Sequence, residues 1–192
     1  VLDSQGSGST SGVIAGMNYA FKRHLENEKK NPNVRSIISM SLGGGKSIAM
    51  NRAVENMIKN SNTFYIVVAA GNENQDVKSS SPASARGILT VMAMGRNDQR
   101  AYFSNFGRTA SIYGTGVEIE STIPGGKTAV YSGTSMATPQ IVGALNHYLD
   151  QFPHMNMKQI KEKMLSDATK NVISGNPKNT PNLMSFIKRQ DD

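Results

Sequence analysis

One serine of the sequence stands where a nucleophile would gain most from its surroundings. Residues 133–139 read GTSMATP, so a glycine turn leads into Ser135 on the first turn of an apolar helix that we expect to end at Gln151. The free N–H groups and the positive end of a helix stabilise negative charge that develops on an attacked carbonyl. The pattern also fits an ordinary helix cap, and both interpretations can hold together, with Thr134 as the N-cap and Ser135 as the nucleophile.

A second side chain suited to this chemistry is Asn72, which follows the apolar segment 64–69 and the small residues Ala70 and Gly71. An asparagine amide held at the end of a strand can donate a hydrogen bond to an oxyanion, and the loss of such a donor costs about 3 kcal/mol of transition-state stabilisation. The alternative is an asparagine that merely supports a left-handed turn.

A hydrolytic serine also needs a base, and the chain contains three histidines, His24, His147 and His154. Ser135 and His147 lie twelve positions apart on one expected helix, which separates them by about 18 Å along the axis. His154 lies beyond the end of that helix and His24 lies in a basic stretch, so we expect both to be solvated. The sequence therefore offers a nucleophile and an oxyanion donor without a base.

Other chemistries are poorly encoded in these 192 residues. The absence of cysteine excludes a disulfide framework, a thiolate metal site and a cysteine nucleophile. The segment 39–47, SMSLGGGKS, looks like a phosphate loop, but Met40 stands where that motif needs its first glycine. The net charge of +7 is spread along the chain rather than gathered in a stripe, so we expect no nucleic-acid partner. We expect no membrane partner either, because no apolar run approaches the roughly 18 residues of a span.

The elements that must position Ser135 and Asn72 are those of an α/β fold, in three layers, with a mostly parallel central sheet flanked by helices. Apolar spacing predicts helices over 12–29, with Ser11 as the N-cap, over 47–60, over 135–151 and around Met157, and strands over 34–40, 64–69, 88–93, 117–121 and 128–131. In strand–helix–strand units the ligand-binding loops follow the carboxyl ends of the strands. We therefore expect the site at the loops 41–45 and 71–82.

These motifs together resemble the subtilisin-like serine peptidases, or subtilases, and within them the proteinase K-like group. Residues 133–139 match the nucleophile signature of that family, and residues 70–72, AGN, match its oxyanion loop. Further matches lie at 1–3, 6–8, 41–44, 81–84, 103–107 and 182–183. The resemblance covers essentially the whole chain and implies one partial peptidase domain over residues 1–192, with a subtilisin-like fold, its N-terminal part absent, and no second domain.

The resemblance implies a serine endopeptidase that hydrolyses polypeptide substrates through an acyl-enzyme on Ser135. It assigns the oxyanion to the Asn72 side chain and the Ser135 N–H, and it implies that an extended substrate pairs with the segment after residue 40. Pairing of this kind usually gives broad specificity, because main-chain hydrogen bonds carry much of the affinity. The substrate-binding residues implied by the resemblance are Ser41, Leu42, Gly43, Ala69 and Gly71.

The resemblance also implies components that this chain does not encode. The family's Asp and His motifs precede the segment that matches Val1, so we expect an upstream segment to supply both, and the chain alone to be inactive. A propeptide inhibitor and a secreted or vacuolar location agree with the family. The chemistry requires no cofactor. A structural calcium site is left open, because Ser111 replaces an Asp ligand while Arg86 and Ile88 still offer carbonyls.

Two alternatives remain open at this point. One is a catalytically incomplete relative that binds peptides or an inhibitor through the same groove. The other is an unrelated hydrolase with the G-x-S-x-G serine turn. Ala137 argues against it, because that motif has its second glycine at this position.

Overall fold

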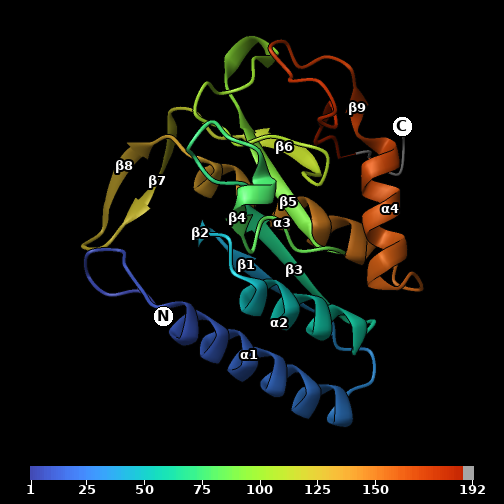
Figure 1. The fold of residues 1–192 in the computed structure, drawn as a ribbon. Coiled ribbons are helices and arrows are strands. Elements are labelled where there is room, and N and C mark those ends of the chain that lie inside the picture. Colours follow the sequence, from blue (N-terminus) through green and yellow to red (C-terminus); the bar gives the residue numbers. More distant parts are fainter. Residues whose placement is uncertain (188–192) are drawn as a thin grey trace.

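A central sheet organises the computed structural model, which describes residues 1–187. Its strands lie in the order β1, β3, β5, β6, β10 and β9 (Figure 1). The neighbouring pairs from β1 to β10 are parallel, and β9 is antiparallel to β10. The strands are β1 (Ser36–Met40), β3 (Phe64–Ala69), β5 (Leu89–Met94), β6 (Ile112–Thr115), β9 (Thr169–Lys170) and β10 (Leu183–Met184). The expected α/β fold with a mostly parallel sheet is confirmed.

Helices cover both faces of this sheet and complete the three layers. Helices α1 (Thr10–Lys30) and α2 (Ile48–Lys59) pack on one face, and α3 (Thr134–Gln151) and α4 (Met157–Asp167) pack on the other (Figure 1). The alternation of side chains along a strand divides β3 between the two cores. Phe64, Ile66 and Val68 face α1 and α2, whereas Tyr65 and Val67 face α3 and α4.

Two small antiparallel ladders and two short 3₁₀ turns complete the chain. The ladder of β2 (Gly44–Gly45) and β4 (Ser80–Ser81) joins the loop after β1 to the loop after β3. The hairpin of β7 (Ile119–Ile123) and β8 (Lys127–Tyr131) stands apart from the central sheet (Figure 1). The 3₁₀ turns are η1 (Val77–Ser79) and η2 (Arg96–Asp98). The first ladder matters most, because it brings two strand-end loops together.

The boundaries of two helices differ from the sequence-based expectations. The first helix is capped by Ser9, whose side chain accepts from the N–H of Gly12, so the predicted cap at Ser11 is wrong. The central helix begins at Thr134 and its N-cap residue is Gly133, which makes no side-chain cap bond, so the predicted cap at Thr134 is also wrong. The Thr134 hydroxyl instead bonds to Gly71 and Asn72 in the loop after β3.

Two predicted strands are observed with nearly the expected boundaries, and three strands of the central sheet were not predicted. The strand over 64–69 is observed as Phe64–Ala69, and the strand expected over 34–40 begins only at Ser36. The sequence did not indicate β6, β9 or β10. Within residues 1–187, no helix is long and apolar enough to cross a lipid bilayer.

Candidate active site

Asn72 lies in the loop that follows β3, and its side chain is fixed at one end by Thr134. The Oδ1 atom accepts two hydrogen bonds, from the Thr134 N–H at 2.8 Å and from the Thr134 hydroxyl at 2.9 Å. The same hydroxyl accepts from the N–H of Gly71 at 3.1 Å. Among the described residues, nothing accepts a hydrogen bond from Nδ2 of Asn72. Thr134 therefore leaves the donor end of this exposed amide for another molecule.

A second donor lies close to this amide. The first N–H groups of a helix have no partner within the helix, and the N–H of Ser135 finds none elsewhere in residues 1–187. A Cβ built on Gly133 would be 3.6 Å from Nδ2 of Asn72 and 3.6 Å from the Ser135 nitrogen. The two unused donor nitrogens thus lie near one point beside Gly133. This arrangement suits the stabilisation of an oxyanion.

The backbone of Ser135 is anchored to Ser41 at the end of β1. Pro139 lies inside α3 and has no N–H, so the Ser135 carbonyl, four residues earlier, lacks its helical donor. The Ser41 hydroxyl donates to this carbonyl at 2.8 Å. In return, the Ser135 hydroxyl donates to the Ser41 carbonyl at 3.3 Å. The Pro139 position thus has a structural purpose that sequence reasoning missed.

These groups border a cleft of about 240 Å³ between the loops after β1 and β3 and the start of α3. Its lining includes the predicted residues Leu42, Gly43, Ala69, Gly71, Asn72 and Ser135. Ser41 lines an adjoining cleft of about 390 Å³, which shares residues 42–45 with the first. Ser41, Leu42 and Gly43 form an irregular segment before β2 rather than a ladder strand. The structure therefore gathers the predicted site residues, while their roles stay predictions.

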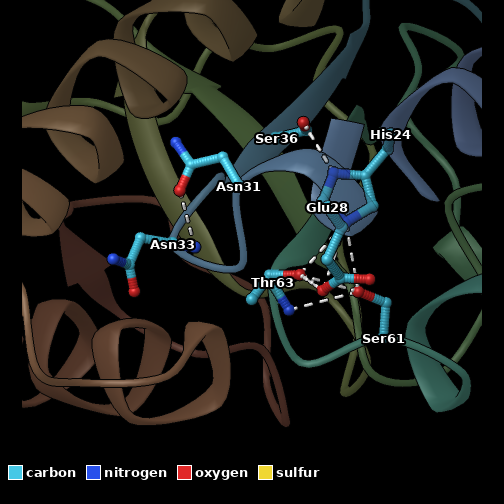
Figure 2. Close-up of polar contacts among 7 residues, drawn as sticks. All are labelled: His24, Glu28, Asn31, Asn33, Ser36, Ser61 and Thr63. Atoms are coloured by element: carbon cyan, nitrogen blue, oxygen red, sulfur yellow. Dashed lines mark hydrogen bonds and ion pairs between the residues drawn. The ribbon is translucent and has the colours of Figure 1, made fainter. Parts of the chain in front are cut away.

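The histidines do not contribute a base to this cleft. His24 was expected to be solvated, but only 2% of its surface is exposed, so this expectation is wrong. Figure 2 shows its ring among hydroxyl groups: Nδ1 pairs with Ser36 at 2.8 Å, and Nε2 pairs with Thr63 at 3.0 Å and Ser61 at 3.3 Å. The Thr63 hydroxyl also donates to Glu28. Burial lowers the pKa of His24, while the nearby Glu28 carboxylate opposes that shift.

The other histidines are exposed and lie outside the cleft. His147 pairs with Gln151 one turn further along α3, at 2.8 Å, and His154 follows the end of that helix. No hydrogen bond joins a histidine to Ser135 within residues 1–187. The spacing of His24 after Met17 and Phe21 on the apolar side of α1 was the signal that could have predicted its burial.

The region around Ser111 does not fit a divalent cation. The Lys161 ammonium donates to the carbonyls of Ile88 at 3.1 Å and Gly87 at 3.3 Å, and its charge would repel a second cation. The Ser111 hydroxyl already accepts from the Thr90 N–H at 3.0 Å and brings no carboxylate. Burial lowers the pKa of Lys161, and Glu162 opposes this. In the described part of the chain, no group of three or more His, Cys, Asp or Glu side chains could hold a metal.

Comparison with known proteins defines the family. The model of the subtilase family matches residues 1–184, and the chain belongs to this family. It is 43% identical, over 97% of its length, to the subtilisin-like serine protease Rho m 2.0101 of Rhodotorula mucilaginosa, and 40% identical, also over 97%, to cerevisin of Saccharomyces cerevisiae. A crystal structure of a cold adapted subtilisin-like serine proteinase superposes over 99% of the chain, with a TM-score of 0.88 and 33% identity.

The matches do not cover the full length of these relatives. The chain spans 58% of the Rhodotorula protein, 32% of cerevisin and 66% of the chain of the solved structure. The family and the fold are therefore established for these 192 residues, and the activity of the whole protein is a matter for proposal.

Proposed function

We propose that this chain is the nucleophile-bearing part of a serine endopeptidase, in which Ser135 forms an acyl-enzyme with a polypeptide substrate. One observation carries the proposal: two unused donors, Nδ2 of Asn72 and the N–H of Ser135, lie near one point beside Gly133, and both residues line an open cleft. Donors fixed before the reaction stabilise the developing oxyanion without any cost of reorganisation.

Each group of the cleft has a defined task in this reaction. The Ser135 oxygen forms a bond to the scissile carbonyl carbon, and the carbonyl oxygen takes up the negative charge between the two donors. The C–N bond then breaks as the base returns the Ser135 proton to the leaving amine, the acyl group stays on Ser135 as an ester, and water hydrolyses that ester to a carboxylic acid and free Ser135. The residues Ser41, Leu42 and Gly43 would pair with the extended substrate, and Ala69 to Gly71 would border the side chain that precedes the cleaved bond.

The proton of the Ser135 hydroxyl requires a base that this chain does not supply. We propose that Asp and His come from an upstream segment, and that the chain alone is inactive. Family resemblance further supports a secreted or vacuolar location and inhibition by a propeptide. A structural calcium ion is not proposed, since Lys161 occupies the carbonyls beside Ser111.

Labelling with a fluorophosphonate, which reacts with activated serines, tests the proposal. The full-length protein should be labelled at Ser135, the Ser135→Ala variant should not, and the chain of residues 1–192 should react far more slowly. Removal of the nucleophile should lower kcat by about a millionfold. Absence of labelling in the full-length protein, together with peptide binding that Ser135→Ala leaves unchanged, would instead establish the catalytically incomplete relative.

A further inference from the structure

Asn105 is a completely buried asparagine beside the loop that carries Asn72, with 0% of its surface exposed. Its Oδ1 accepts from the backbone N–H groups of Glu73 at 3.2 Å and Gln75 at 2.9 Å. Its Nδ2 donates to the carbonyl of Ala70 at 2.9 Å and to the Glu73 carboxylate at 2.6 Å. One side chain thus binds the backbone on both sides of Asn72.

Backbone contacts and the adjacent glycine strengthen this connection. The N–H of Asn105 donates to the Gly71 carbonyl at 3.0 Å, and the N–H of Asn74 donates to the Phe103 carbonyl at 2.8 Å. Gly71 has a φ of +101°, and a Cβ built on it would lie 2.3 Å from Nδ2 of Asn105. Glycine at position 71 therefore provides both the backbone conformation and the space that the Asn105 side chain needs.

Two residues hold the loop that carries Asn72. Thr134 fixes Oδ1 of Asn72 and accepts from the Gly71 N–H, whereas Asn105 binds the backbone at residues 70, 73 and 75, on both sides of Asn72. We propose that Asn105 is a positioning residue for the oxyanion site: by holding residues 70–75, it aims Nδ2 of Asn72 at the point shared with the Ser135 N–H. The inference rests on the proposed endopeptidase function.

The bond between Asn105 and Glu73 adds an electrostatic contribution. Glu73 follows Asn72 directly, and its exposed carboxylate is tied to Nδ2 of Asn105. Glu73 also lines the cleft, so a carboxylate released from Asn105 would oppose the negative charge of the oxyanion, by an amount that solvent screening reduces. The Asn105 amide therefore both positions the Asn72 donor and holds the Glu73 carboxylate in place.

A double-mutant cycle in the full-length protein tests this inference. Asn105→Ala should lower kcat by about ten- to a hundredfold with little change in KM, because displacement of a pre-positioned group mainly affects the transition state. If Asn105 acts through Asn72, then in the Asn72→Ala background the same substitution should lower kcat by no more than about threefold, since contacting residues do not contribute additively. An equal loss in both backgrounds would overturn the inference.

Asn182 provides a matched control, because its amide clamps a loop in the same way, through the N–H and the carbonyl of Ile173. Asn182→Ala should lower the thermal midpoint and leave kcat within about twofold. If Asn105→Ala does not fold, Asn105→Asp is made together with Glu73→Gln, so that no second carboxylate faces Glu73; this pair retains the two acceptor contacts, loses the donor to Ala70, and should give the same cycle relative to Glu73→Gln alone. A wild-type protein without hydrolysis would contradict the proposed function, whereas hydrolysis that is insensitive to Asn105 would contradict this inference alone.

Discussion

Two regions of the molecule contain the same kinds of side chain and use them in opposite ways. In the cleft, Asn72 and Ser135 each keep a donor that the described residues do not use. In the cluster around His24, on the α1 side of the sheet, both ring nitrogens meet hydroxyl groups and Glu28 accepts from Thr63 (Figure 2). The catalytic potential of a polar residue therefore depends not only on its type but also on which of its polar groups the fold leaves unused.

The difference has a structural origin. The cleft residues follow the carboxyl ends of parallel strands, where loops meet and backbone groups leave the ladder. The His24 cluster lies between α1, β1 and the loop before β3, where the rings of Phe21 and Phe64 pack against the buried imidazole while Glu28, Ser61 and Thr63 stay partly exposed. Buried polar groups in such a place must be paired within the protein. His24, Ser61 and Glu28 are thus a structural network, despite the resemblance of their side chains to a catalytic set.

The largest expected effect is on the cleft side of this comparison. Asn72→Ala in the full-length protein should lower kcat by about a hundred- to a thousandfold and leave KM nearly unchanged, because its Nδ2 acts on the transition state. Steady-state kinetics with a peptide substrate measure both constants. Asn72→Asp keeps an acceptor for Thr134 and replaces the donor by a negative charge, so it should be no more active. A variant of either kind with wild-type kcat would refute the oxyanion role.

The opposite result is expected for the buried cluster. His24→Leu removes the partner of the Ser36 and Thr63 hydroxyls and should lower the free energy of unfolding by about 2–4 kcal/mol, with kcat unchanged at a temperature where the variant is folded. Urea denaturation and kinetics on one preparation measure the two quantities. The exposed His147 is the control, and His147→Leu should change stability by no more than about 0.5 kcal/mol. Loss of kcat without loss of stability would give His24 a catalytic role.

The lowered pKa of His24 predicts that the stability contributed by the buried cluster depends on pH. Because burial lowers this pKa from its ordinary value of 6.5, the unfolded chain binds a proton at a higher pH than the folded chain. The stability contributed by neutral His24 is therefore complete above pH 6.5 and is lost as the pH falls from there through the folded pKa. Unfolding measured between about pH 7.5 and about pH 5 should show this loss, and His24→Leu should flatten it. If the free energy of unfolding of the wild type and of His24→Leu changed with pH by the same slope, His24 would not be the group responsible.

The smallest expected effect is the loss of stability on substitution of Lys161, whose ammonium, like the groups around His24, is paired within the protein. Lys161→Met removes a donor from the Ile88 and Gly87 carbonyls and should lower stability by about 1 kcal/mol. Calcium should not restore it. Adding Ser111→Asp to that variant supplies a carboxylate and should make the thermal midpoint rise with calcium, relative to the same titration of the wild type. A calcium response of the wild-type protein, which retains Lys161, would show that the ammonium does not exclude the ion.

Much of this protein can be predicted from local sequence pattern. The strand Phe64–Ala69 was predictable because a short apolar run between turn signals fits a strand buried on both faces. The segments 133–139 and 70–72 were visible as motifs, and the family model confirms the family they indicate. The capping residues were missed because serine and threonine near a helix start have several backbone partners within reach, and only their geometry selects one.

What remained was decided by contacts between residues far apart in the chain. Ser41 and Ser135 exchange hydrogen bonds across 94 positions, and Asn105 reaches back to the loop of Asn72. Two basic residues, Lys22 and Arg23, precede His24 in sequence, whereas its polar neighbours in space are Ser36, Ser61 and Thr63. A sequence thus determines which groups can donate and accept, and the packing of strands and helices decides which of them remain free.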